Sequence, residues 1–307
     1  MAARRIEWSG VFTVCVTPFA ADGALDDAAV RLLVETLIAD GTQGIVLAGS
    51  TGEWFSMSDE ERIHLFQVAA EQNRGRVKLL AGVSSISTAT AVRLAAAAKD
   101  AGLDGGLLLP PPYILPTERE LLAFVAAVDE VGLPIMLYNN PPRTGVNLDA
   151  RLLGKLLSLR HVVALKDSAK DMHQLSATLR AYGETLAIFT GIETYTVPTV
   201  QRGGVGVVAM APNIIGRTAI ALHEAAARGD WAAAAAAQLP IDLIYDRMYA
   251  WSYNPYVVIK EAMRLLGRPG GWPRPPLLPM LDADREALRQ VLAEIGAVPP
   301  VMPATAA

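Results

Sequence analysis

The sequence predicts an α/β protein with the (β/α)8-barrel fold, also called a TIM barrel. Short apolar runs alternate along the chain with longer amphipathic helical patterns. The runs are continuous rather than interrupted by polar residues, which is typical of parallel strands that helices bury. Eight such units, about 20–35 residues apart, match a barrel better than an open doubly wound sheet, which usually has fewer strands.

The expected elements alternate from the first strand to the eighth. We expect strands at Val11–Val16, Gly44–Ala48, Lys78–Val83, Gly105–Leu109, Pro134–Tyr138, Val162–Lys166, Leu186–Thr190 and Gly206–Met210. We expect helices at Asp26–Ala39, Ser58–Asn73, Thr88–Ala101, Thr117–Val131, Leu148–Leu159, Met172–Tyr182, Tyr195–Arg202 and Ile214–Arg228.

Three further helical patterns follow the eighth unit, at Trp231–Ala250, Tyr256–Leu266 and Asp284–Ile295. They cannot all belong to the ring of barrel helices. The sequence therefore predicts a catalytic barrel domain over residues 1–229 and a C-terminal three-helix segment over residues 230–307, packed on the barrel.

Composition excludes several classes of protein. The net charge is −4, and no window combines lysine and arginine with aromatic residues, which argues against a nucleic-acid partner. No stretch reaches the roughly 18 apolar residues of a membrane span, and no signal-peptide pattern follows the N-terminus. The only cysteine, Cys15, excludes an internal disulfide and a multi-cysteine metal site. We expect a soluble, cytoplasmic protein.

Lys166 is the first candidate for a catalytic residue. The active site of such barrels lies at the C-terminal ends of the strands. Of the six lysines, only Lys166 ends an apolar strand, so its amine would be partly desolvated. Desolvation favours the neutral form, which attacks carbonyl carbons. The alternative is a lysine that reaches solvent or pairs with a carboxylate such as Asp167.

Two neighbouring strand ends supply further candidates. Ser50 and Thr51 stand between two glycines, which permit a tight turn whose hydroxyls and N–H groups can bind a carboxylate. Tyr138 ends the fifth strand and could transfer protons. Arg143 follows two prolines and suits a second carboxylate. Taken singly, each could instead be an ordinary turn, a half-buried aromatic or a surface arginine.

These motifs together resemble the dihydrodipicolinate synthase / N-acetylneuraminate lyase family of class I aldolases. The similarity covers nearly the whole chain. It rests on Val16-Thr17-Pro18-Phe19, Gly49-Ser50-Thr51-Gly52-Glu53, Tyr138-Asn139, Val163-Ala164-Leu165-Lys166-Asp167-Ser168, Gly203-Gly204-Val205-Gly206-Val207-Val208, and Asn254-Pro255 ahead of Lys260.

The resemblance implies a role for each matching residue. Lys166 would form the Schiff base, and Tyr138 would act as general acid and base. Ser50 and Thr51 would bind the substrate carboxylate. The Val208 carbonyl would face the bound 2-oxo acid. Tyr113 would reach into the site of a neighbouring subunit and extend the proton relay there. The last role implies at least a dimer, and the family is commonly a homotetramer, a dimer of dimers.

The resemblance leaves the reaction open among several options. Arg143 is typical of the synthases, which condense pyruvate with aspartate semialdehyde, whereas Ser50 is typical of the lyases. The alternatives are a catabolic aldolase or dehydratase for 2-keto-3-deoxy sugar acids, a hydroxypyrroline-carboxylate deaminase, and a barrel that binds a 2-oxo acid without catalysis. No cofactor is expected, because a protonated imine is itself an electron sink.

Two further expectations concern metals and regulation. The four histidines show no metal-ligand spacing, so no metal site is expected. Many synthases bind lysine as an inhibitor, through residues that here are Trp54, Phe55, Asp59 and Pro112. Apolar side chains cannot solvate a zwitterion, so we expect no inhibition by lysine.

Overall fold

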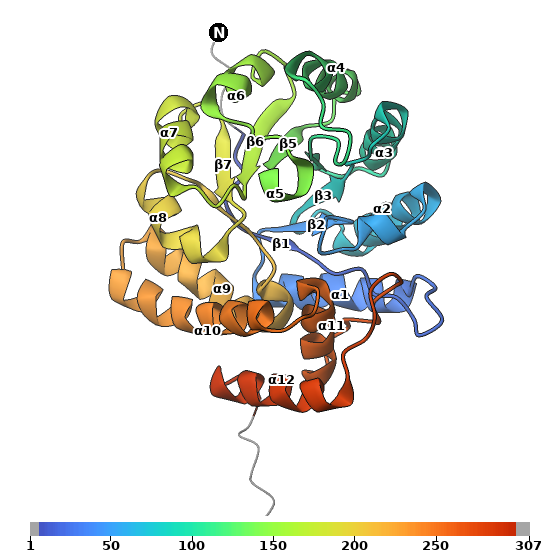
Figure 1. The fold of residues 1–307 in the computed structure, drawn as a ribbon, viewed down its shortest axis with the longest axis vertical. Helices are drawn as coiled ribbons and strands as arrows, with labels where there is room; N and C mark the ends of the chain where they lie inside the picture. The colour runs from blue at the N-terminus through green and yellow to red at the C-terminus, as the bar shows by residue number, and fades with distance from the viewer. Residues whose placement is uncertain (1–5, 299–307) are drawn as a thin grey trace, which may run out of the picture.

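The structure, a computed structural model, describes residues 6–298 and contains a closed barrel of parallel strands (Figure 1). Each strand pairs with its neighbour in sequence, and β1 pairs with β8 to close the barrel. The predicted fold class is thereby confirmed. The strands are β1 Gly10–Val14, β2 Gly44–Leu47, β3 Lys78–Gly82, β4 Gly105–Leu108, β5 Ile135–Asn139, β6 Val162–Asp167, β7 Ala187–Thr190 and β8 Gly206–Ala209.

Helices cover the outside of the barrel, except that the one-turn helix Pro141–Thr144 lies over one end of the barrel (Figure 1). They are α1 Asp27–Asp40, α2 Asp59–Asn73, α3 Thr88–Asp100, α4 Glu118–Asp129, α5 Pro141–Thr144, α6 Ala150–Leu156, α7 Met172–Tyr182, α8 Thr196–Gln201 and α9 Pro212–Ala227, with short 3-10 helices η1 Trp54–Ser56 and η2 Glu193–Tyr195. Local chemistry fixes several of their starts. Ser58 and Thr117 form capping boxes with Glu61 and Glu120, which satisfy backbone N–H groups that the first turn of a helix leaves unpaired.

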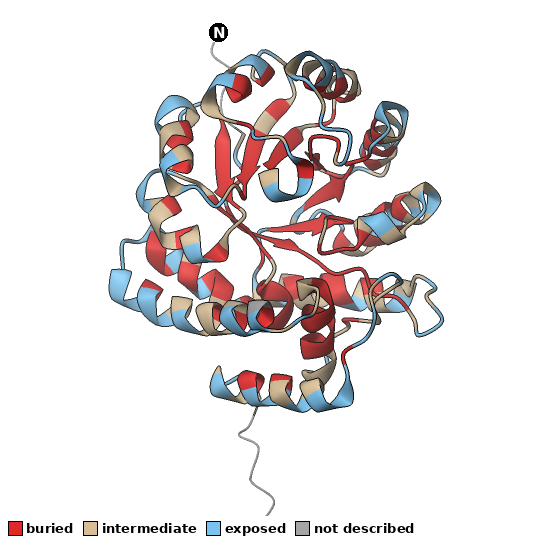
Figure 2. Ribbon diagram, in the orientation of Figure 1, coloured by how far each residue is buried: buried red, intermediate tan, exposed pale blue. Residues whose placement is uncertain are grey.

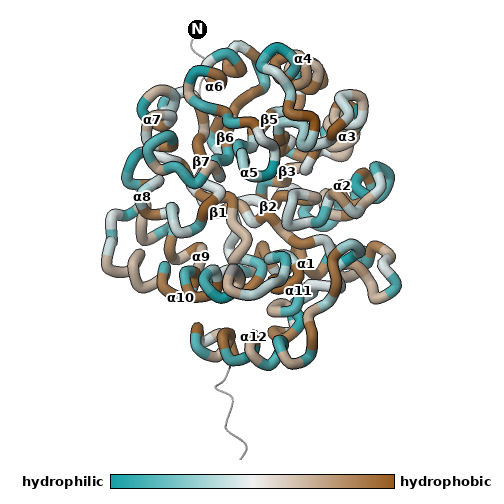
Figure 3. The backbone as a smooth tube through the Cα atoms, viewed as in Figure 1, coloured by the Kyte–Doolittle hydropathy of each residue, from teal (hydrophilic) through white to brown (hydrophobic). Residues whose placement is uncertain are grey.

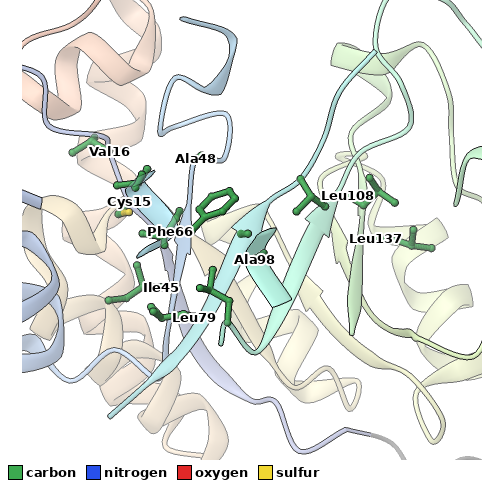
Figure 4. Close-up of a cluster of buried hydrophobic side chains, with 14 of the residues drawn as sticks. Cys15, Val16, Ile45, Ala48, Phe66, Leu79, Ala98, Leu108 and Leu137 are labelled. Carbon is green, nitrogen blue, oxygen red and sulfur yellow. The ribbon is translucent and has the colours of Figure 1, made fainter. Parts of the chain in front are cut away.

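The strands divide their side chains between two layers. Figure 2 shows the strands almost entirely buried and the helices buried along one side. Figure 3 shows hydrophobic colour in the strands and alternating colours along the surrounding helices. In β2, Ile45 and Leu47 point outward into the layer under the helices, while Val46 joins the barrel interior. Figure 4 shows the outer layer, where Phe66 of α2 and Ala98 of α3 pack near the strands.

Three helices follow the barrel, as predicted: α10 Trp231–Ala250, α11 Pro255–Leu265 and α12 Asp282–Glu294. α10 packs along α9, and α12 lies beyond α11 at the edge of the molecule (Figure 1). The boundary at residue 230 stays a prediction, and residues 299–307 of the expected segment lie outside the described residues. In the described part of the chain, no helix is long and apolar enough to cross a membrane.

Candidate active site

A cavity of about 290 Å³ opens at the C-terminal ends of the strands. The predicted site residues Ser50, Thr51, Tyr138, Arg143 and Lys166 all line it. The remaining lining residues are Val14, Asn140, Pro142, Ser168, Lys170, Gly191, Ile192, Met210, Pro255 and Tyr256. The ends of six strands (β1, β2, β5, β6, β7 and β8) and the start of α11 therefore meet at this cavity, which is where the sequence predicts the chemistry.

Lys166 points into the barrel because of its position in β6. Ala164 belongs to the interior cluster and Leu165 to the outer layer, so the next residue returns to the interior. The lysine is only 4 % exposed, and its Nζ lies 4.1 Å from the centroid of the Tyr138 ring. This geometry combines desolvation with a cation–π contact.

Lys166 makes no ion pair with Asp167, the partner that the alternative interpretation suggested. Asp167 faces the other side of β6, where its Oδ2 accepts a hydrogen bond from Asn139 Nδ2 at 2.9 Å. Its Oδ1 accepts one from the backbone N–H of Ala169 at 3.1 Å. Burial raises the pKa of this carboxyl, and the Asn139 hydrogen bond opposes the rise. Asp167 thus ties β6 to β5 instead of neutralising the lysine.

Tyr138 is the direct partner of Lys166 in the parallel pairing of β5 and β6. The side chain is 6 % exposed, and its hydroxyl oxygen accepts a hydrogen bond from Asn140 Nδ2 at 2.9 Å. That contact leaves the phenolic proton available for donation into the cavity. A proton-transferring group and an amine therefore lie side by side.

The turn after β2 presents Ser50 and Thr51 to the cavity. Its glycines are needed because the backbone is tightly packed there. A Cβ at Gly49 would lie 2.7 Å from Val14 Cγ2, and one at Gly52 would lie 3.1 Å from the backbone of Ala48. Thr51 is buried and Ser50 is half-buried. Both hydroxyls can therefore bind an anionic group from a fixed backbone.

A buried ion pair holds the turn after β2 against α11, and the sequence analysis did not predict it. Glu53 contacts Lys260 of α11, and the two side chains are 0 % and 1 % exposed. The Lys260 ammonium also donates to the Trp272 carbonyl oxygen at 2.8 Å, and Glu53 Oε2 accepts from the Arg274 N–H at 3.0 Å. Burial lowers the pKa of Lys260 to about 8, and the negative charge of Glu53 opposes that change.

The sequence did contain a signal for this pair. Tyr256 to Ile259 precede Lys260 as an uninterrupted apolar run, and α11 is buried from Tyr256 through Met263. A lysine that follows such a run inside a buried stretch needs a buried partner.

Arg143 comes to the cavity on α5, a one-turn helix that the sequence analysis did not predict. Pro141 and Pro142 occupy its first positions, where the missing backbone N–H groups are not needed. The arginine is exposed at the mouth of the cavity.

Val208 and Tyr113, unlike the other predicted site residues, do not line the cavity. Val208 is buried in the barrel interior, below the cavity lining. Tyr113 is 87 % exposed, with a positive φ of 77°, and does not line the cavity of its own chain.

Two buried polar groups beside Lys166 were also missed. At Gly191, a Cβ would lie 2.0 Å from Ser168 Oγ and 2.6 Å from Lys166 Cε, so the two side chains share that space. Glu193 is 2 % exposed, and its Oε1 accepts from the Ala211 N–H at 2.8 Å. Burial raises the pKa of Glu193 to about 7, against the lowering effects of that hydrogen bond and of the Lys166 charge.

Cys15 is buried, and burial raises its pKa to about 12, so it stays a thiol. Within residues 6–298, no group of three or more histidine, cysteine, aspartate or glutamate side chains could hold a metal ion.

Comparisons with known proteins agree with this fold and site. Residues 7–295 match the Dihydrodipicolinate synthetase family. An uncharacterized DapA-like lyase of Rhizobium meliloti is 40% identical over 293 residues, which are 95% of this chain and 98% of that protein. A 4-hydroxy-tetrahydrodipicolinate synthase of Moorella thermoacetica is 34% identical over 95% of this chain and 99% of its own.

A solved structure extends the comparison to three dimensions. YagE, a prophage protein of the dihydrodipicolinic acid synthase family from E. coli K12, was crystallised in complex with pyruvate. It superposes with a TM-score of 0.91 at 27% identity, over 95% of this chain and 100% of its own. The match in sequence and fold runs from before the first strand to the last helix, and this chain is a lyase that belongs to the dihydrodipicolinate synthetase family.

Proposed function

We propose that this lyase forms a Schiff base between Lys166 and pyruvate or a related 2-oxo acid. The buried Lys166 amine beside the Tyr138 ring is the observation on which the proposal depends. A neutral amine adds to the C2 carbonyl, and loss of water then leaves a protonated imine. YagE, whose structure contains pyruvate, supports this choice of ligand.

The other predicted residues have complementary roles. Ser50 and Thr51 bind the carboxylate of the 2-oxo acid. By the family resemblance, the Val208 carbonyl faces the bound acid from β8. Tyr138 donates its phenolic proton to the departing hydroxyl when water is lost. The resulting phenolate accepts a proton from the carbon next to the imine, which gives an enamine, and Tyr138 later returns that proton. The imine takes up the electrons, so the reaction needs neither a metal nor another cofactor.

The synthase reaction with aspartate semialdehyde is the first candidate for the second half of the chemistry. The enamine carbon forms a bond to the aldehyde carbon, and the aldehyde oxygen takes up a proton. Water or the amine of the product then displaces Lys166. Arg143 at the cavity mouth suits the carboxylate of this aldehyde, and the Moorella thermoacetica relative is named for this activity.

The same imine supports the catabolic alternatives. In the reverse direction, the carbon–carbon step cleaves a 2-keto-3-deoxy sugar acid. When the substrate carries a suitable leaving group, the same enamine instead eliminates water or an amine from it. For the deaminase alternative, the substrate is a hydroxypyrroline carboxylate. The half-buried Ser50, a serine as in the lyases, is the observation that favours this second candidate.

We further propose a homo-oligomer, a dimer of dimers, in the cytoplasm. Tyr113, Ile114 and Leu115 form an apolar loop tip that is 87%, 51% and 63% exposed. A second copy of the chain could cover this tip and receive Tyr113 near its own cavity. The single buried thiol of Cys15 is compatible with a reducing compartment.

Steady-state assays with purified enzyme test the proposed reaction. Pyruvate with aspartate semialdehyde, 2-keto-3-deoxy sugar acids, and hydroxypyrroline carboxylate are compared as substrates at equal concentration. Turnover of one of them, abolished by Lys166→Ala, would support the proposal. Binding of 2-oxo acids without turnover of any member of the panel would instead support the non-catalytic alternative.

A further inference from the structure

A buried polar pair lies directly behind Tyr138 and Lys166. Asn139 is the residue after Tyr138 in β5. Asp167 is the residue after Lys166 in β6, and it is the direct partner of Asn139 in the register of the two strands. Successive side chains of a strand point to opposite faces, so the polar pair faces the helix layer while the phenol and the amine face the cavity. Asn139 and Asp167 are 0% and 3% exposed.

The Asn139 amide donates and accepts hydrogen bonds at once. Its Nδ2 donates to Asp167 Oδ2 at 2.9 Å and to Asn147 Oδ1 at 3.1 Å. Its Oδ1 accepts from the backbone N–H of Leu148 at 2.9 Å. One side chain therefore holds the end of β6 on one side and the loop before α6 on the other.

Further hydrogen bonds fix the chain just after Lys166. Asp167 Oδ1 accepts from the Ala169 N–H at 3.1 Å, and the backbone carbonyl oxygen of Asn139 accepts from the Ser168 N–H at 2.8 Å. A shift of Lys166 along its strand would break these bonds together with the bond between Asn139 and Asp167.

The same network reaches the one-turn helix at the cavity mouth. Asn147 exchanges two hydrogen bonds with Gln174 of α7, at 2.7 Å and 2.9 Å. The loop over residues 145–149 connects α5 to α6, and α5 lines the cavity with Pro142 and Arg143. The inner end of the cavity and its mouth therefore share one buried anchor, the Asn139 amide.

We propose that Asn139 and Asp167 are positioning residues: the hydrogen bond between them fixes where the phenol lies against the imine-forming amine. The proposal rests on the Schiff-base function and adds the residues that hold its proton-transfer geometry. Neither residue lines the cavity, so neither takes part in bond making. Displacing reacting groups by about 1 Å can cost about 10²-fold in rate, so a pair behind the site can determine turnover.

Two single variants break the match between donor and acceptor. In Asp167→Asn, the N–H donors of Asn139 and Ala169 compete for one carbonyl oxygen. In Asn139→Asp, two carboxylates lie together without a donor between them. Exchange of the pyruvate methyl protons in heavy water at about pH 8, followed by NMR, should be about 10–100-fold slower in each. The KM for pyruvate in this exchange should change by less than about threefold, because Ser50 and Thr51 are untouched.

The reciprocal double variant, Asn139→Asp with Asp167→Asn, exchanges the two side chains. The amide now at position 167 can donate to the carboxylate at position 139, which can still accept from the Leu148 N–H. Proton exchange should recover to within about threefold of the unchanged protein. A double variant as slow as the slower single variant would overturn the proposal, and so would unaltered exchange in both single variants. The single variants decide the question where the double variant does not fold.

Asp104→Asn is the matched control for a loss of stability. Asp104 also joins two neighbouring strands: its Oδ2 accepts from the Leu79 N–H at 2.9 Å, and its Oδ1 contacts Lys78 Nζ at 2.7 Å. It lies just before β4, at the end of the barrel opposite the cavity. This variant should unfold at a lower urea concentration and keep the exchange rate of the unchanged protein. Equally slow exchange in Asp104→Asn would overturn the proposal, because any weakened strand pairing would then have the same effect.

End-point borohydride trapping with pyruvate separates this proposal from the Schiff-base function. Every variant should form the adduct on Lys166, because the amine stays in the cavity. An adduct together with unaltered exchange in both single variants would overturn the positioning role alone. The absence of an adduct from the unchanged protein would contradict the Schiff-base function, and the positioning role with it.

Discussion

Lys166 Nζ lies 4.1 Å from the centroid of the Tyr138 ring, and the two residues are paired across neighbouring strands β6 and β5. The contact follows directly from strand register. Because both side chains point into the barrel at the same height, an amine and a phenol meet at the cavity floor. The predictions below begin with this pair.

Tyr138→Phe should separate imine formation from proton transfer. The ring would still cover Lys166, while the hydroxyl that bonds to Asn140 would be lost. We expect the turnover number to fall about 10²–10⁴-fold, the usual contribution of a general acid or base. Exchange of the pyruvate methyl protons in heavy water, followed by NMR, should fall in parallel. Asn140→Ala, which removes only the partner of the hydroxyl, should have a smaller effect; full exchange in Tyr138→Phe would contradict the role.

Breaking the Glu53–Lys260 pair should destabilise the protein and loosen the carboxylate-binding turn. Glu53→Gln or Lys260→Met leaves one buried group without its partner, which costs about 3–5 kcal/mol. The double variant should lose less than the sum of the two losses. Urea unfolding measures these free energies, and KM for pyruvate should rise because Ser50 and Thr51 share the turn.

A matched surface pair is the control for that experiment. Arg31 contacts Glu71 at 2.7 Å, with both side chains substantially exposed. Arg31→Gln should change stability by less than about 1 kcal/mol. Similar losses in Arg31→Gln and Lys260→Met would show that burial does not determine the strength of the Glu53–Lys260 pair.

Glu193 should make stability depend on pH in a defined direction. Its pKa is raised by burial from 4.5 to about 7, so the native state holds the proton more tightly than the unfolded chain. The stabilisation is complete below pH 4.5 and is lost as pH rises through about 7. Between about pH 5 and pH 8 the loss should be about 2–3 kcal/mol.

Glu193→Gln keeps an oxygen acceptor for the Ala211 N–H and cannot ionise. Urea unfolding of this variant should therefore lack that part of the pH dependence. Glu184→Gln, at an exposed glutamate, is the control. The same pH dependence in Glu193→Gln and in the unchanged protein would rule out Glu193 as its source.

Lysine should not inhibit the enzyme. Trp54 packs under the Arg62 guanidinium, 5.4 Å from its ring centroid, and the rings of Phe55 and Tyr256 are 6.5 Å apart. The aromatic side chains of Trp54 and Phe55 solvate a zwitterion poorly. Initial rates with increasing lysine should stay constant, and an inhibition constant below the millimolar range would contradict this prediction.

The sequence predicted the strands well because each is an uninterrupted apolar run closed by a turn. Their observed ends differ from the predicted ones by one or two residues, as Gly10–Val14 against Val11–Val16 illustrates. The candidate residues at the ends of β2, β5 and β6 meet for the same reason: parallel strands in one barrel end on one side.

Long-range partnerships were harder to predict. Glu53 and Lys260 are far apart in sequence, and nothing local shows that the C-terminal segment returns to the β2 turn. Glu193 follows β7 directly and was overlooked, although the rule of inspecting polar residues after each strand applies to it. The left-handed backbone of Lys170 could not be predicted from the sequence, because glycine is the residue that usually indicates such a position.

Borohydride reduction in the presence of pyruvate tests the central claim most directly. Peptide mass spectrometry should find the mass of a carboxyethyl group on the peptide that contains Lys166, and none in Lys166→Ala. Lys260, the other buried lysine beside the cavity turn, should stay unmodified. The absence of a pyruvate-dependent adduct, or an adduct on another lysine, would contradict the assignment of Lys166 as the Schiff-base residue.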